Sequence, residues 1–320
     1  LFGLLTFALY MMKVLTSLSA LPILRNPIVT LGTYDGVHIG HKTILTQLIN
    51  KAKETGKDSM LITFDPHPRQ ALGLGEISLL STLEEKINLL SETGLDYLLI
   101  LPFTKEFSTQ GATEFITNVL IDQLNISEIM LGYDHKFGHN REGDVHLLAD
   151  VLTKTGRFVT EIPAQDVDEI IVSSTKIRTA LIKGEIQTAN RLLGYNYQVS
   201  GKVVLGNQLG RTIGFPTANI ELTNTSKLIP SDGVYAVKLT VEGITHHGMM
   251  NIGIRPTVSN SQNRVIEVHL FDFNSDIYGK SVTITVCNHL RREQVFSGIE
   301  ALTEQLKKDE VDSRRYFASL

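Results

Sequence analysis

The sequence predicts an α/β, Rossmann-like domain followed by a small antiparallel β-barrel domain with a C-terminal helix. In the first half of the chain, short apolar runs alternate with amphipathic stretches, which is typical of a parallel sheet covered by helices. In the second half, short strand-like segments are separated by glycine turns, which is typical of an antiparallel barrel. We expect the domains to span residues 13–184 and 185–320, with the join near Gly184 to Asn196.

Short apolar runs are the expected strands of the first domain. They are Ile28–Leu31, Met60–Phe64, Tyr97–Leu101, Ile129–Leu131 and Phe158–Ile162. After the first of them, Ile44, Leu45, Leu48, Ile49 and Ala52 recur at helical spacing and predict a helix that begins near His38. Ligands of such folds bind where the parallel strands end, so the segments that follow the strands are the candidate site.

The most informative segment runs from Gly32 to His41 and joins the first strand to this helix; we call it the histidine turn. Its glycines let the backbone approach a ligand, and the helix N-terminus offers N–H groups to phosphates. His38 and His41 are three residues apart, which places both imidazoles on one helix face. The segment predicts a nucleotide site, with Gly32, Asp35, Gly36 and Gly40 near the phosphates. The alternative is a glycine turn whose histidines only cap the helix.

Later segments of the first domain also follow strands. In Thr63–Pro68, two prolines stiffen the loop around His67, although an ordinary rigid turn would look similar. Gly132–Gly143 mixes aromatic, charged and glycine residues and predicts a ligand loop. Val172–Arg178 opens a helix with three hydroxyls and two cations, which suits a polyphosphate, although a serine there is also an ordinary N-cap.

The second domain is predicted from short strands and a closing helix. The strands are Val199–Val204, Val234–Val241, Val265–Phe273 and Val282–Val286. Ser297 and Glu300 form a capping box for the helix, and Ile299, Leu302 and Leu306 are its expected buried face.

Composition limits the partners and the location. A hydrophobic fraction of 42% in 320 residues is enough for two cores. The net charge of −4, with scattered lysines and arginines, argues against a nucleic-acid surface. The single cysteine, Cys287, excludes an internal disulfide and a cysteine-based zinc site, so we expect a cytoplasmic protein.

The first residues, 1–12, form an apolar run that is too short to span a bilayer and lacks the charged front of a signal peptide. We expect the natural start at Met11 or Met12 and no membrane partner. A weak membrane anchor is the alternative.

The order of these motifs resembles the bacterial bifunctional riboflavin kinase/FAD synthetase family. The resemblance continues in the second half through Gly201–Val204, Gly210–Asn219, Asn251–Thr257 and Glu267–Phe273, and it covers the chain from about Val14 onward. Two departures are visible. Tyr34 stands where the family more often has phenylalanine. His135 also replaces a usual phenylalanine, and this change affects how the loop Gly132–Gly143 packs on its flavin or nucleotide.

The resemblance implies an FMN adenylyltransferase in the first domain. ATP is then the co-substrate and Mg²⁺ the metal cofactor, while riboflavin, FMN and FAD are the flavin ligands. His38, His41 and Arg178 are the implied catalytic residues at the α-phosphate. Ser173, Ser174 and Thr175 are expected to donate to the outer phosphates, and His67, Asp134 and Arg141 to lie near the flavin.

The resemblance implies a riboflavin kinase in the second domain. Glu267 is our candidate base, because a carboxylate in mid-strand, on one face with His269 and Phe271, is a poor site for an unused charge. An ion pair with a nearby arginine is the alternative. Thr217 and Asn219 offer neutral oxygens to Mg²⁺. Gly206, Gly210, Arg211 and Gly214 are expected at the ATP phosphates, and Arg291 near the flavin.

Other function classes stay open at this point. They are a single-function nucleotidyltransferase with a non-catalytic flavin-binding barrel, an RNA-handling protein, and a flavin carrier without turnover. The acidic balance and the absence of tryptophan disfavour the RNA-handling protein. The sequence is also compatible with a weak homo-oligomer.

Overall fold

The structure is a computed structural model that describes residues 11–75, 77–133, 135–167, 170–206, 209–255 and 263–320. The chain forms two compact units. The first contains the residues up to Ile77 and Leu83–Val172, and the second contains Ser78–Thr82 and Ser173–Leu320. The division therefore falls before the expected boundary at 184, because the helix after Ser173 packs against the next helix of the second unit.

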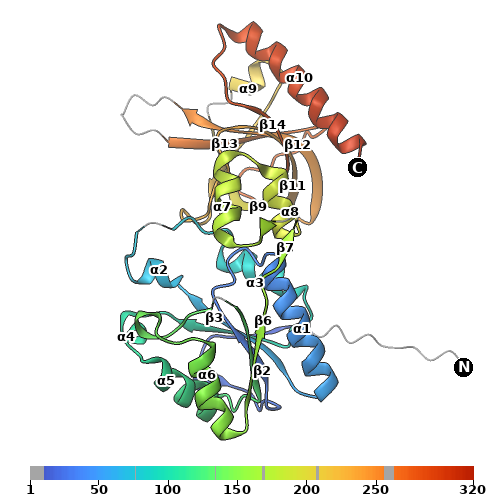
Figure 1. The fold of residues 1–320 in the computed structure, drawn as a ribbon. Helices are drawn as coiled ribbons and strands as arrows, with labels where there is room; N and C mark the ends of the chain where they lie inside the picture. Colours follow the sequence, from blue (N-terminus) through green and yellow to red (C-terminus); the bar gives the residue numbers. More distant parts are fainter. Residues whose placement is uncertain (1–10, 76, 134, 168–169, 207–208, 256–262) are drawn as a thin grey trace, which may run out of the picture. The chain divides into compact units, whose positions relative to one another are not determined.

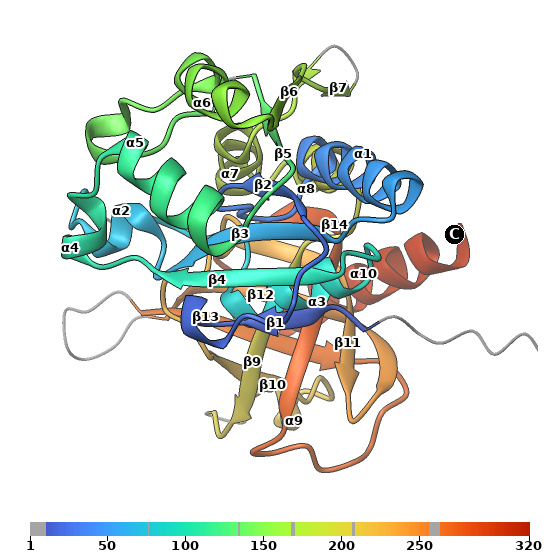
Figure 2. The same ribbon diagram turned by 90° about the horizontal axis from the view of Figure 1, so that it is seen from below.

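The first unit is built on a six-stranded sheet in which all neighbouring strands are parallel. Its strands are β1 (Lys13–Leu15), β2 (Ile28–Leu31), β3 (Ser59–Asp65), β4 (Tyr97–Pro102), β5 (Glu128–Gly132) and β6 (Phe158–Ile162). Their order is β1-β4-β3-β2-β5-β6, and Figure 2 shows β1, β4, β3 and β2 side by side. The predicted Rossmann-like fold is confirmed. The sequence did not predict β1, which has three residues and no continuous apolar run.

Helices cover both faces of this sheet, because strand side chains alternate between two cores. The helices are α1 (Ile39–Thr55), α2 (Pro68–Ala71), α3 (Leu83–Ser91), α4 (Lys105–Ser108), α5 (Ala112–Phe115), a π-helical continuation (Ile116–Gln123) and α6 (Val145–Leu152). Leu48 of α1 and Leu90 of α3 pack on Leu61 of β3 in one core. The neighbouring residues Met60 and Ile62 belong to the other core, with side chains from α5 and α6. A short pair, β7 (Asp166–Val167) and β8 (Ile170–Ile171), follows β6.

The second unit is a closed antiparallel barrel with helices before and after it. α7 (Ser174–Lys183) and α8 (Ile186–Leu193) precede the strands β9 (Gln198–Val204), β10 (Ala218–Leu222), β11 (Gly233–Val241), β12 (Ile244–Arg255), β13 (Asn263–Leu270) and β14 (Ser281–Arg292). A short α9 (Leu209–Thr212) lies between β9 and β10. The strand order around the barrel is β10-β13-β12-β11-β14-β9. The predicted barrel is confirmed, although the predicted strand 265–273 ends at Leu270.

The C-terminal helix, α10 (Ile299–Ala318), packs against β11, β12 and β14 of the barrel (Figure 1). Its predicted capping box is wrong, because the residue that precedes the helix is Gly298 and it makes no side-chain cap. Its predicted buried face is also wrong at Ile299, which is 58% exposed. The helix contacts the barrel through later turns, where Asp309 and Ser313 are buried. None of the described helices combines the length and the apolar character needed to cross a membrane.

Candidate active sites

The histidine turn has an unusual backbone that its surroundings hold in place. Tyr34, Gly36 and Val37 have φ angles of 48°, 81° and 37°. A left-handed conformation is unfavourable for a β-branched residue such as Val37, and such strain persists only where the structure enforces it. The side chain of Val37 is fully buried in the core with those of α1 and α3, and this burial offsets the strain. The turn is therefore rigidly placed at the carboxyl end of β2.

The two imidazoles of the turn lie face to face. Their ring centroids are 3.6 Å apart with an interplanar angle of 13°, and the Tyr34 ring stacks on His41 at 4.4 Å. His38 is the N-cap of α1, and its Nδ1 accepts a hydrogen bond from the His41 backbone N–H at 3.4 Å. The alternative interpretation, in which the histidines only cap the helix, is therefore correct in that His38 does cap α1. This cap uses only Nδ1, so the proton of a neutral His38 lies on Nε2.

His41 is held in its neutral form. Its Nδ1 is fully buried and has no hydrogen-bond partner among the described residues. Burial, and to a smaller extent His38 and Lys86, lowers the pKa of His41 well below the usual 6.5. A neutral imidazole with a buried Nδ1 can carry its proton on Nε2 and donate from there.

Lys86 is a residue of this site that the sequence prediction missed. It lies on α3, is 6% exposed, and donates a hydrogen bond from Nζ to the Thr33 carbonyl at 2.7 Å. Burial lowers the pKa of Lys86, while Asp35 and Asp65 act in the opposite direction. One signal could have found it. Lys86 is spaced by helical intervals from Leu83 and Leu90, so it occupies a position of the apolar face.

The remaining predicted residues of the turn, Asp35, Gly32 and Gly40 among them, are closely surrounded. Asp35 is 2% exposed. A Cβ at Gly40 would come within 3.3 Å of the His38 ring, and one at Gly32 within 3.2 Å of the Tyr34 ring and 3.9 Å of His135. A side chain at either position would therefore crowd the ring of Tyr34 or of His38.

The predicted flavin residues of the first unit lie in loops after β3 and β5. His67 is the N-cap of α2, where its Nδ1 accepts a hydrogen bond from the Arg69 N–H at 3.2 Å. Arg141 is exposed and has a φ of 60°. Asp134 lies outside the described residues. The loop around Arg141 is closely packed, because Glu142 accepts a hydrogen bond from the Ala112 N–H at 2.8 Å.

The predicted phosphate residues at Val172–Arg178 begin α7, in the second unit. Ser173 is the N-cap, and its Oγ accepts a hydrogen bond from the Lys176 N–H at 3.3 Å. Ser174 and Thr175 follow in the first turn. Arg178 donates from Nε to the Ser78 carbonyl at 2.8 Å. The structure groups these four residues with one another and not with the histidine turn, which belongs to the first unit.

A polar row crosses three strands of the barrel. Glu267 of β13 is the direct neighbour of Asn219 on β10 and of Asn251 on β12. Directly opposed residues share one face of a sheet. The flanking residues Ile266 and Val268 are buried in the barrel interior, so the row lies on the outer face. Glu267 is partly buried there, in agreement with the alternation that the sequence showed.

The glycine segment before β10 is fitted closely to this row. A Cβ at Gly206 would overlap the Asn219 amide, and one at Gly210 would overlap the Phe215 carbonyl. Phe215 is buried, and His269 Nδ1–H donates to the Pro216 carbonyl at 2.8 Å. These contacts fix Thr217 and Asn219 at the start of β10. Gly214 has a φ of 83° and Arg211 is exposed, whereas residues 207–208 lie outside the described residues.

Arg291, predicted near the flavin, makes a two-pronged ion pair with Asp309 of α10. Nε donates to Oδ1 at 2.9 Å and Nη2 to Oδ2 at 2.8 Å. Gln305 also donates to Asp309, at 2.9 Å. Arg291 thus joins β14 to the C-terminal helix, a role that the sequence did not indicate.

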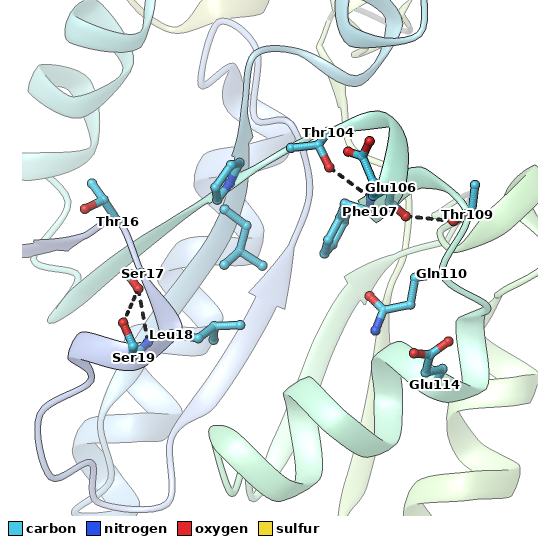
Figure 3. A pocket seen from close by; sticks show the side chains of 12 residues that line it. Thr16, Ser17, Leu18, Ser19, Thr104, Glu106, Phe107, Thr109, Gln110 and Glu114 are labelled. Carbon is cyan, nitrogen blue, oxygen red and sulfur yellow. Dashed lines mark hydrogen bonds between the residues drawn. The ribbon is translucent and has the colours of Figure 1, made fainter.

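A cavity of about 610 Å³ lies where β4 ends (Figure 3). Its lining includes hydroxyl side chains, for example Thr16 and Thr104, and the carboxylates of Glu106 and Glu114. The described residues that line it include none of the predicted site residues and no lysine, arginine or histidine. Its charge therefore does not suit a polyphosphate.

Two family profiles match the chain. The profile described as FAD synthetase matches residues 21–176, and the profile described as riboflavin kinase matches residues 193–317. Each match falls mainly in one of the two units. The first match includes the histidine turn and Ser173–Thr175, and the second includes the polar row.

Curated proteins are similar over nearly the whole chain. A Listeria monocytogenes protein named bifunctional riboflavin kinase/FMN adenylyltransferase is 40% identical over 298 residues, which cover 92% of this chain and 94% of that protein. Proteins of the same name from Bacillus subtilis and Escherichia coli K12 are 38% and 35% identical. These alignments cover 92% and 91% of this chain, and 93% and 92% of those proteins.

A solved structure is also similar over nearly the whole chain. The crystal structure of a macrolide-efflux protein from Streptococcus pneumoniae is 29% identical, with a TM-score of 0.86. The alignment covers 95% of this chain and 99% of that one. The two proteins therefore share the complete fold.

Proposed function

Because the chain belongs to the family of bifunctional riboflavin kinase/FMN adenylyltransferases, we propose that its units catalyse two consecutive reactions. The second unit transfers the γ-phosphoryl group of ATP to riboflavin and yields FMN and ADP. The first unit transfers the adenylyl group of ATP to FMN and yields FAD and pyrophosphate. The observation that carries this proposal is the presence of two separate polar sites, the histidine turn and the row around Glu267, each within its own family match.

In the adenylyl transfer, a phosphate oxygen of FMN attacks the α-phosphorus of ATP, and the bond to the bridging oxygen breaks as pyrophosphate leaves. The protein needs no nucleophile of its own, only alignment and charge stabilisation. His38 and His41 donate from Nε2 to the α-phosphate. The backbone N–H groups at the start of α1 bind the neighbouring phosphates of ATP. The stacked rings support this role, because each ring restricts the movement of the other.

Several other residues keep the roles that the resemblance implies. Gly32, Asp35, Gly36 and Gly40 shape the phosphate site of the turn, Ser173, Ser174, Thr175 and Arg178 bind phosphates, and His67, Asp134, Arg141 and Arg291 contact flavin. The FAD synthetase match supports the serine segment, since it extends to residue 176. The proposed functional boundary between residues 184 and 185 falls in the interval between the two family matches, which end at residue 176 and begin at residue 193.

In the kinase reaction, the primary hydroxyl of riboflavin attacks the γ-phosphorus of ATP, and the bond to the β–γ bridging oxygen breaks. Glu267 accepts the hydroxyl proton. Gly206, Gly210, Arg211 and Gly214 surround the phosphates. The position of Glu267 supports this role, because a partly buried carboxylate on the outer face of the barrel has two amides beside it, those of Asn219 and Asn251.

Mg²⁺ would neutralise the phosphate charge of ATP in this reaction. Thr217 and Asn219 would hold it through neutral oxygens, with phosphates and water as the other ligands. One observation supports the fit of these residues to Mg²⁺. The missing Cβ of Gly206 leaves room for the Asn219 amide, and Glu267 lies directly beside Asn219. The single cysteine favours work in the cytoplasm, and the net charge of −4 favours small-molecule substrates over a nucleic-acid partner. We expect no membrane partner and a weak homo-oligomer at most.

Glu267→Gln tests the kinase assignment, because it keeps the shape of the side chain and removes the base. We expect FMN formation from riboflavin and magnesium-ATP to fall about 10²-fold or more, with FAD formation from supplied FMN unchanged. Chromatography of the flavins measures both. Near-normal FMN formation would assign the base to another group. If the parent converts FMN to FAD but leaves riboflavin untouched, the alternative of a single-function nucleotidyltransferase is correct.

Joint replacement of His38 and His41 by asparagine tests the adenylyl site. We expect FMN-to-FAD turnover to fall roughly 10²- to 10³-fold, the effect of losing preorganised oxyanion donors. Riboflavin phosphorylation serves as the internal control and should survive, so that FMN accumulates. Circular dichroism checks the fold of the variant. FAD production at the parent rate would mean that the histidines only cap α1.

A further inference from the structure

Lys86 places a charged side chain in the interior of the first unit, where an unused charge is costly. Its Nζ donates to the carbonyl of Thr33, the second residue of the histidine turn, at 2.7 Å. The Thr63 side chain, from β3, donates to the same carbonyl at 3.2 Å and is itself fully buried. Donors from two elements that are distant in the sequence therefore converge on one carbonyl oxygen of the turn.

A lysine can also act through an ion pair, and Lys51 of α1, whose side chain is 42% exposed, is an example in the same unit. Lys51 pairs with the buried carboxylate of Glu128 at 2.6 Å, at the first residue of β5. That pair lies at the amino end of a strand, opposite to the edge where the strands end. Lys86 differs from Lys51 because its hydrogen bond goes to a main-chain oxygen of the turn and not to a carboxylate.

The turn needs such support, because three of its residues have left-handed backbone angles. Strained backbone persists only where the surrounding structure over-determines it. A fixed Thr33 carbonyl constrains the first peptide groups of the histidine turn. The same turn carries the two stacked imidazoles, so the constraint reaches them through the backbone. Misplacement of reacting groups by about 1 Å can cost roughly 10²-fold in rate.

We propose that Lys86 is a positioning residue for adenylyl transfer, which fixes the Thr33 carbonyl and through it the orientation of His38 and His41. This inference rests on the proposed function of the first unit. Thr63 acts in the same way and with a smaller effect, since it supplies the longer of the two hydrogen bonds and carries no charge.

Lys86→Met tests the proposal, since methionine keeps the apolar stem and removes the ammonium group. We expect kcat for FMN adenylylation to fall about 10-fold or more, while the KM values for FMN and ATP change by less than about 3-fold, because alignment in the transition state is lost and not binding. Lys86→Arg, which keeps a cation and donors, should recover part of kcat. Thr63→Val should lower kcat by a smaller factor. Riboflavin phosphorylation by the same molecules should stay at the parent rate.

Lys51→Met is the matched control, because it also removes a lysine from a buried partner in this unit. We expect it to lower stability and to leave kcat for FMN adenylylation near the parent value. A parent protein that makes no FAD from FMN contradicts the proposed function whatever Lys86 does. A folded Lys86→Met variant with parent kcat, or an equal kcat loss in Lys51→Met, overturns the positioning role. If Lys86→Met does not unfold cooperatively, Thr63→Val and Lys86→Gln decide by the same criteria.

Discussion

The hydroxyl of Tyr34 has a buried partner, which explains how tyrosine is accommodated in the histidine turn. Its oxygen lies 2.9 Å from Thr30 Oγ1 of β2, and both side chains are buried. Burial raises the pKa of Tyr34, so the phenol stays neutral. Its ring stacks on His41 just as a phenylalanine ring could. The substitution thus adds a satisfied hydrogen bond without altering the stacking surface.

His41 should make the stability of the first unit depend on pH. Its pKa is well below 6.5 in the folded protein and near 6.5 in the unfolded chain. Below about pH 6.5, the unfolded chain binds a proton that the folded protein does not, so the free energy of unfolding falls as the pH is lowered. Above that pH both states are neutral and the contribution of His41 is constant. The titratable groups that face it are His38, Tyr34 and Lys86.

Denaturant unfolding at several pH values between 7 and 5 measures this effect. His41→Asn should lose less stability than the parent over this range, because it removes the linked proton. His146→Asn, at an exposed position on α6, is the control and should follow the parent. Parallel curves for the parent and His41→Asn would show that His41 titrates alike in both states.

At the scale of elements, the ion pair of Arg291 with Asp309 attaches α10 to the barrel. The Asp309 side chain is 3% exposed and its partner 19%. Removal of one member of a buried pair leaves an uncompensated charge, so we expect Arg291→Met to reduce the free energy of unfolding by about 3 kcal/mol. Lys308→Met is the control, because its pair with Glu304 is exposed. Chemical denaturation measures both. Equal stability of the two variants would contradict the attachment role.

Riboflavin kinetics of the Arg291→Met variant then separate its two roles. A raised KM for riboflavin in the folded protein would support a flavin contact besides the structural pair. An unchanged KM would leave Arg291 with the structural role alone.

The strands and motifs that could be predicted are those whose signal is local in sequence. β2, β3 and β4 are continuous apolar runs, because they are buried on both faces of a parallel sheet. β12 was missed, since its outer face carries polar residues such as His247 and Asn251 that interrupt the pattern.

The same distinction holds for the sites. The histidine turn is ten consecutive residues, so its chemistry could be read directly. The contact of Lys86 joins residues 53 apart, and that of Arg291 joins residues 18 apart across two elements. Tertiary packing creates both contacts, and no sequence pattern specifies the partner. The closing helix illustrates the reverse error, because a good capping pattern was present where the backbone did not use it.

At the scale of the whole molecule, the barrel should function without the first unit. We expect a fragment of residues 185–320 to phosphorylate riboflavin, because it retains the barrel, α10 and the row around Glu267. A fragment of residues 173–320 should unfold at higher denaturant, since α7 packs on α8 and buries Ile177 and Leu181. Flavin chromatography and denaturation measure the two properties. A fragment that folds cooperatively and makes no FMN would refute the domain assignment.

The short segment Ser78–Thr82 makes the second unit discontinuous, with residues 83–172 as an insertion within it. Lys227 donates to the Leu80 carbonyl across 147 residues of chain, and Leu79 pairs with Lys227 as an isolated bridge. During synthesis on the ribosome, this hydrogen bond cannot form until residue 227 has emerged. Leu80 is 1% exposed in the folded protein. It therefore lacks part of its native surroundings while the inserted residues are being synthesised. A nascent chain that stalls in this interval lacks the contact of Leu80 with Lys227, and apolar side chains exposed at such a stage favour aggregation.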